Sequence, residues 1–153
     1  MDIQFVVISF SLITQVLNRK YFCKQMNDSG VGTLVVNLDK GPLRALPNKP
    51  RQIVFCITNS LGSGKRLDSH NLFVRRTLKF LFLQCDIKPE QITVLTFTPL
   101  AGVFRKFTQV TNLCKKHGLR HILVKRHQGY IKRNQLCNEK AFLNFLSQLH
   151  GYV

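Results

Sequence analysis

The chain alternates between short apolar runs and segments in which apolar residues recur at helical spacing. Three compact runs follow the loop-rich first third: Ile53–Ile57, Ile92–Thr96 and His121–Lys125. Runs that are apolar through their centres are typical of strands buried on both faces of a parallel sheet. Helical spacing predicts three helices, from Asp68 or Ser69 to about Cys85, from Pro99 to Gly118, and from Lys140 to Leu149. The order β-α-β-α-β-loop-α predicts a three-layer α/β domain with a mostly parallel sheet over residues 53–153.

Residues 1–52 are predicted to form an irregular N-terminal extension. They hold turn-forming residues such as Asn27–Gly30 and Gly41-Pro42, with one apolar run, Leu34–Val36, that could be an edge strand. Ile3–Leu17 is too short and too polar to span a bilayer, so we expect a buried strand or helix there. The opening Met-Asp-Ile-Gln also lacks the basic start of a signal peptide. We therefore expect no transmembrane segment and a nuclear or cytoplasmic location.

The charge balance points to a polyanionic partner. The chain has 23 Lys and Arg against seven Asp and Glu, a formal net charge of +16. Such a surface attracts nucleic acid first, and acidic proteins or anionic membranes second. Since no two of the seven carboxylates form a close pair in the sequence, carboxylate-dyad chemistry and carboxylate-rich cation cages are not expected. The same shortage makes a Ser-His-Asp arrangement improbable.

The five cysteines predict neither a disulfide framework nor a metal centre. They are widely spaced, odd in number and without a Cys-x-x-Cys pair, which fits a reducing compartment. The one alternative is a zinc site from residues that lie near one another in sequence: Cys114, His117, His121, His127 and Cys137. Their spacing matches no common structural zinc pattern, so we expect buried thiols and surface histidines.

The segment Asn59–Arg66 resembles a phosphate-binding P-loop because it follows a strand and ends in Gly-Lys. A P-loop needs Gly at its start and Ser or Thr after the Lys, but this chain has Asn59 and Arg66 in those places. No later strand ends in the Asp that would position Mg²⁺. We therefore expect a basic loop that touches phosphate without catalysis, through Gly62, Gly64, Lys65 and Arg66.

The predicted nucleic-acid contacts lie where the second and third strands end. Ten Lys or Arg occur from Val103 to Lys140, with Glu139 as the only acid. Carboxyl ends of parallel strands open toward one crevice, so residues after these strands should share a surface. The predicted contact residues are Thr96, Thr98, Arg105, Lys106, Lys125, Arg126, His127, Gln128 and Gly129. The charged residues among them are all basic, which favours binding to the sugar-phosphate chain of RNA or DNA.

Three segments of this half resemble the second RecA-like domain of Upf-like and senataxin-like superfamily 1 helicases. Asp86–Thr96 is similar to the turn and strand entering motif IV, His127-Gln128-Gly129 resembles the core of motif V, and Phe142–His150 resembles the stretch before motif VI. The resemblance covers about residues 53–153 and implies a RecA-like, P-loop NTPase-type half. It also implies that ATP and Mg²⁺ would bind only if another chain supplies the first RecA-like domain.

The chain departs from that family at several positions. Phe97–Gly102 lacks the Gln expected after motif IV, Tyr130-Ile131 stands where a Glu is expected, and Gly151–Val153 ends where motif VI would begin. Without a phosphate loop or arginine finger, the isolated chain is not expected to hydrolyse ATP. Two functions are predicted: a nucleic-acid-binding helicase-like domain, or a small basic non-enzymatic interaction protein or degenerate helicase remnant.

Overall fold

A computed structural model describes residues 1–153 except 58–63, 98–106, 125–130, 133–134, 137 and 152–153. Its strands are β1 (Phe5–Ser9), β2 (Thr33–Asn37), β3 (Gln52–Ile57), β4 (Ile92–Phe97), β5 (Arg120–Val124), β6 (Ile131–Lys132) and β7 (Gln135–Leu136). The α-helices are α1 (Ser11–Arg19), α2 (Phe22–Asp28), α3 (Gly64–Leu83), α4 (Phe107–His117) and α5 (Glu139–Gln148). Two 3₁₀ turns, η1 (Pro89–Gln91) and η4 (Leu149–Gly151), precede β4 and follow α5.

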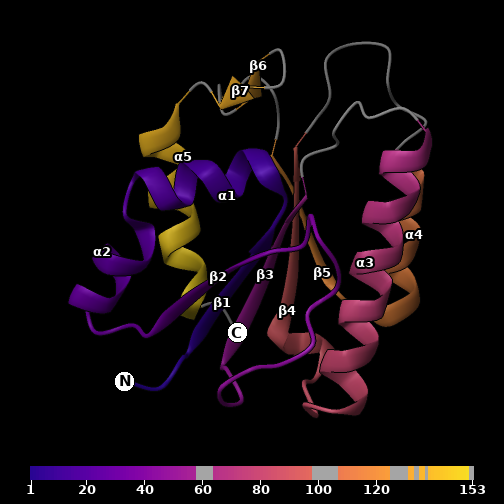
Figure 1. Ribbon diagram of the computed structural model, residues 1–153, viewed down its shortest axis with the longest axis horizontal. Helices are drawn as coiled ribbons and strands as arrows, with labels where there is room; N and C mark the ends of the chain where they lie inside the picture. Colours follow the sequence, from indigo (N-terminus) through magenta and orange to yellow (C-terminus); the bar gives the residue numbers. More distant parts are fainter. Residues whose placement is uncertain (58–63, 98–106, 125–130, 133–134, 137, 152–153) are drawn as a thin grey trace.

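Five strands form one parallel sheet in the order β2-β1-β3-β4-β5, and β6 pairs with β7 in a separate antiparallel ribbon. Helices α1, α2 and α5 cover one face of the sheet, while α3 and α4 cover the other (Figure 1). The fold is therefore the predicted three-layer α/β domain. Its strand order is one of the two common orders of doubly wound sheets, and the direction of winding reverses between β1 and β3.

The strands are buried because successive side chains supply the two faces of the sheet alternately. Phe5 and Val7 of β1 pack in the core beneath α1, α2 and α5. Val6 and Ile8 pack on the opposite face, in the core beneath α3 and α4. All four side chains are almost completely buried, so β1 contributes to the core on both faces of the sheet.

The N-terminal third differs from the prediction of an irregular extension. Leu34–Val36 does belong to an edge strand, β2, as expected. However, β1 pairs with β3 in register from Phe5↔Gln52 to Ser9↔Cys56. Ile3–Leu17 contains both a buried strand and the start of a helix, since its apolar spacing changes after Ser9. A boundary at residue 52 would divide one sheet, so residues 5–57 belong to the same folded unit.

The predicted elements of the second half match the structure closely at their carboxyl ends. Gly118 ends α4 as expected: its φ of 67° is left-handed, and the next amide, of Leu119, donates to the Cys114 carbonyl at 2.9 Å. Helix α3 begins at Gly64, so both predicted caps, Asp68 and Ser69, lie inside the helix. Helix α4 begins at Phe107, and the Pro99 start predicted for it lies outside the described residues. Within the described ranges, no helix has the length and apolarity that a membrane crossing requires.

Candidate functional site

A polar cluster lies where β1 ends, at the point of reversal in the sheet. The Ser11 hydroxyl donates to Asp39 Oδ2, and its amide donates to Oδ1 at 3.3 Å. His70 of α3 places Nε2 3.9 Å from Asp39 Oδ1, and its ring stacks on Phe10 at 3.9 Å between centroids. These four residues, Phe10, Ser11, Asp39 and His70, are here called the β1-end cluster and come from three separate segments of the chain.

The geometry of the β1-end cluster favours a structural role. A serine nucleophile needs a histidine that accepts its proton, whereas the Ser11 hydroxyl donates to a carboxylate. Asp39 instead accepts from the first amide of α1, which is where a negative charge stabilises a helix. Sequence reasoning missed this cluster, because neighbouring strands had to be ordered before Asp39 and His70 could be placed together.

Thr96 is the predicted contact residue whose surroundings the structure describes fully. Its side chain is 1% exposed, and Oγ1 lies 2.7 Å from His121 Nε2 on the adjacent strand β5. Burial lowers the pKa of His121 below its ordinary value. The Thr96 hydroxyl is therefore buried and hydrogen-bonded to His121.

The other predicted contact residues fall largely outside the described residues. These are Thr98, Arg105, Lys106, Lys125, Arg126, His127, Gln128 and Gly129, together with Gly62 of the P-loop-like segment. Gly64, Lys65 and Arg66 form the first turn of α3, directly after the undescribed segment 58–63. Their part in binding phosphate stays a prediction.

The cysteines and histidines weighed as zinc ligands have other surroundings. Cys114 is buried, which raises the pKa of its thiol to about 11. The His117 ring packs against Phe82 with centroids 5.6 Å apart, and His121 contacts Thr96. His127 and Cys137 lie outside the described residues. Within the part of the chain that the structure describes, no group of three potential ligands gathers to hold a metal ion.

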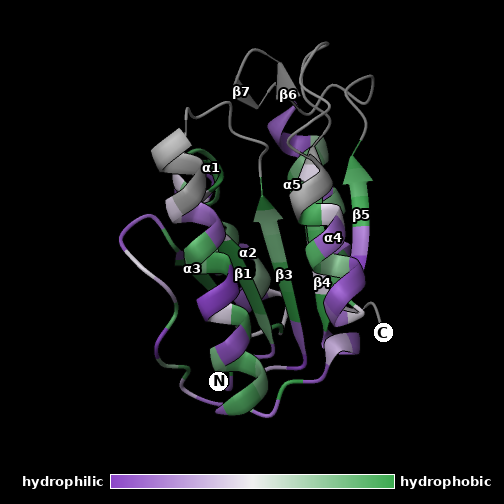
Figure 2. Cartoon of the chain, turned by 90° about the vertical axis from the view of Figure 1, so that its right-hand side faces the viewer, coloured by the Kyte–Doolittle hydropathy of each residue, from purple (hydrophilic) through white to green (hydrophobic). Residues whose placement is uncertain are grey.

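Positive charge is concentrated on one helical layer. Helices α3 and α4 carry seven Lys and Arg against one Asp, a formal balance of +6. Helices α1, α2 and α5 carry three Lys and Arg against one Asp and one Glu, a balance of +1. Among the side chains that are described, no Lys or Arg of α3 or α4 pairs with a carboxylate. We call the outer surface of α3 and α4 the basic face, and Figure 2 views the molecule from this side.

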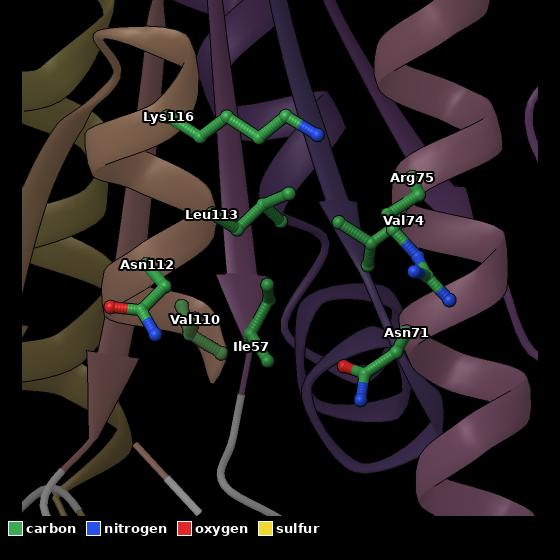
Figure 3. A pocket seen from close by; sticks show the side chains of 8 residues that line it. All are labelled: Ile57, Asn71, Val74, Arg75, Val110, Asn112, Leu113 and Lys116. Carbon is green, nitrogen blue, oxygen red and sulfur yellow. The ribbon is translucent and has the colours of Figure 1, made fainter. Parts of the chain in front are cut away.

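A groove between α3 and α4 interrupts the basic face. It encloses about 490 Å³ and is lined by Ile57, Asn71, Val74, Arg75, Val110, Asn112, Leu113 and Lys116. Figure 3 shows Arg75 and Asn71 entering from α3 and Lys116 crossing from α4, with Ile57 and Leu113 between them. The groove thus combines an apolar floor with amide and cationic groups on its walls.

The spacing of residues along α3 and α4 is a signal in the sequence for this groove. Asn71, Val74 and Arg75 of α3 lie three and four residues apart, as Leu113 and Lys116 do on α4 with a spacing of three. Residues at these spacings share one side of a helix. Each helix therefore has polar residues bordering its apolar face, and both borders line the same groove.

Comparison with known proteins gives no family. No protein-family model and no curated protein matches the chain. A solved structure, the rat Sly1 N-terminal domain, matches with a TM-score of 0.44 and 14% sequence identity, over 80% of this chain and 74% of that chain. A match at this level supports no assignment of family or function.

The helicase resemblance predicted from the sequence is wrong. No helicase or other family model matches the chain, and the structural match reported above is to the rat Sly1 N-terminal domain. His127-Gln128-Gly129 lies outside the described residues, and described residues of the other two segments have local structural roles. Gln91 of η1 accepts from the Lys88 amide at 3.0 Å and donates to the Arg51 carbonyl at 3.1 Å, and Phe142 and Leu146 are buried contacts of α5. Gln91, Phe142 and Leu146 thus serve the packing of the α/β fold, and nothing about ATP, Mg²⁺ or a second helicase domain is carried over.

Proposed function

We propose that this chain is a nucleic-acid-binding α/β module that holds a sugar-phosphate backbone against its basic face. The observation that carries the proposal is the difference in charge between the two helical layers, +6 against +1. Solvated helices that serve only solubility carry both signs interspersed. A surface with a large excess of positive charge attracts a polyanion over long range and displaces the polyanion's counterions on binding.

The cations of the basic face are available for such a contact. Arg75, Arg76 and Lys79 on α3, and Lys115 and Lys116 on α4, are all exposed. They belong to two neighbouring helices of one layer (Figure 2), so an extended strand can meet several of them at once. Contacts to phosphate carry no sequence information, and binding through this face should therefore tolerate many sequences.

Charge reversal on each layer tests the proposal. A labelled single-stranded oligonucleotide of mixed sequence is titrated with the wild-type chain and followed by fluorescence anisotropy. Arg76→Glu combined with Lys79→Glu should weaken binding by roughly tenfold or more. The matched control, Lys24→Glu with Lys140→Glu, makes the same change of charge at exposed positions on the opposite layer and should weaken binding much less.

Two results would overturn the proposal. One is the absence of binding by the wild-type chain at low salt, and the other is an equal loss of affinity in both double variants.

The predicted loop contacts are tested in the same assay by Lys125→Glu with Arg126→Glu. A loss of affinity there would add the segment after β5 to the interface.

A further inference from the structure

The groove between α3 and α4 has the dimensions and lining of a ligand site. Its volume of about 490 Å³ falls within the range of roughly 300–1,000 Å³ that small-molecule sites occupy. Ile57, Val74 and Leu113 make its floor apolar. A phosphate chain alone gains nothing from such a floor, so the groove fits a ligand that has both an apolar face and a negative charge.

We infer that the groove takes one nucleotide of a single strand, with the base against the apolar floor and its phosphates against Arg75 and Lys116. This inference rests on the proposed function and adds a subsite to it. The two cations stand on opposite walls, one on α3 and one on α4 (Figure 3). A strand that crosses the groove would therefore place phosphates on both sides of the inserted base.

The remaining lining matches the chemistry of a base. The faces of every nucleobase are flat and can pack against apolar side chains, which Ile57, Val74 and Leu113 supply. The edges carry both donors and acceptors. A carboxamide offers both kinds of group, and Asn71 projects from α3 toward Ile57 (Figure 3).

An oligonucleotide that lacks its bases separates this inference from the proposed function. The abasic strand has the same phosphates as its parent, so counterion release is unchanged. The wild-type chain should bind the parent strand roughly fivefold or more tightly than the abasic strand, because one base buries apolar surface against the floor of the groove. Equal affinity for the two strands would overturn the base subsite and leave the proposed function standing. A failure to bind either strand would overturn both.

Variants of the groove test where that preference arises. Asn71→Ala and Leu113→Ala should each reduce the ratio of the two affinities toward one, with thermal unfolding used to confirm that each variant folds. The control Arg76→Ala should weaken both strands and leave the ratio unchanged. A ratio that stays at the wild-type value in both groove variants would show that the base binds elsewhere and would contradict the inference.

A free nucleotide could supply the same chemistry as a strand. Adenosine monophosphate and uridine monophosphate are therefore titrated against the wild-type chain. Binding that is much weaker than that of the oligonucleotide supports a strand subsite, because the strand adds the phosphate contacts of the basic face. Affinity equal to that of the oligonucleotide would contradict the strand and assign the groove to free nucleotides.

Discussion

Ser9 and Thr14 form a buried hydroxyl pair where β1 passes into α1. Their oxygens lie 2.6 Å apart, and Thr14 also donates to the Phe10 carbonyl at 3.2 Å. Thr14→Val should lower the free energy of unfolding by about 1–3 kcal/mol, because it leaves the Ser9 hydroxyl buried without its partner. The double variant Ser9→Ala with Thr14→Val should cost less than the sum of the single variants. Urea unfolding measures the stability of the two single variants and the double variant. Strictly additive losses of stability would contradict the pairing of the two hydroxyls.

His121 should make the stability of the fold depend on pH. Because burial lowers its pKa in the folded state, the unfolded chain takes up a proton first as the pH falls through about 6.5. The free energy of unfolding should therefore decrease on acidification from about pH 7.5 to about pH 5.5. His121→Gln should show a smaller decrease in urea titrations at the two pH values, since all other groups are common to both chains. An equal decrease in both would contradict this role.

Helix α5 depends on a single cap for its start. The Asn138 side chain accepts from the Ala141 amide at 3.1 Å, which satisfies one of the free amides of the first turn. Asn138→Ala should lower the free energy of unfolding by about 0.5–2 kcal/mol. Asn138→Asp should retain stability, because a carboxylate accepts the same bond and suits the positive end of the helix. Comparable losses in both variants would rule out capping as the cause.

Hydrophobic pattern predicted most of the elements but not their full arrangement. Ile53–Ile57 and Ile92–Thr96 were recognisable because strands buried on both faces are apolar throughout. Ile3–Leu17 was ambiguous because a strand is followed by a helix after a single residue, Phe10. Helix α2 (Phe22–Asp28) was not predicted, since its seven residues bury only Phe22 and Met26. Short elements of this kind are stabilised by tertiary packing more than by their own propensity.

The sequence predicted the positive charge of the candidate site but not its position. Sequence alone showed an excess of Lys and Arg after Val103, and it placed the contacts on loops after the strands. The groove residues Arg75 and Lys116 lie instead on the faces of α3 and α4. They come together because β3 and β4 are neighbours, which brings their following helices onto the same side of the sheet. Right-handed crossovers in one direction produce that arrangement.

At the scale of the molecule, the sheet separates two helical layers of different charge. One layer has few cations, and its Glu139 pairs with Arg19 across α5 and α1. The other presents exposed cations without carboxylate partners among the described side chains. This polarity predicts that a polyanion binds in one orientation, with α1, α2 and α5 facing away from it.

The salt dependence of single-strand binding tests this orientation most directly. Each phosphate contact contributes about 0.7 to the slope of the logarithm of affinity against the logarithm of salt concentration. Lys79→Ala with Lys115→Ala on the basic face should therefore reduce the magnitude of that slope by about 1.4. Lys24→Ala with Lys140→Ala on the opposite layer should leave the slope at its wild-type value. Slopes that change equally in the two double variants, or in neither, would contradict binding through the basic face.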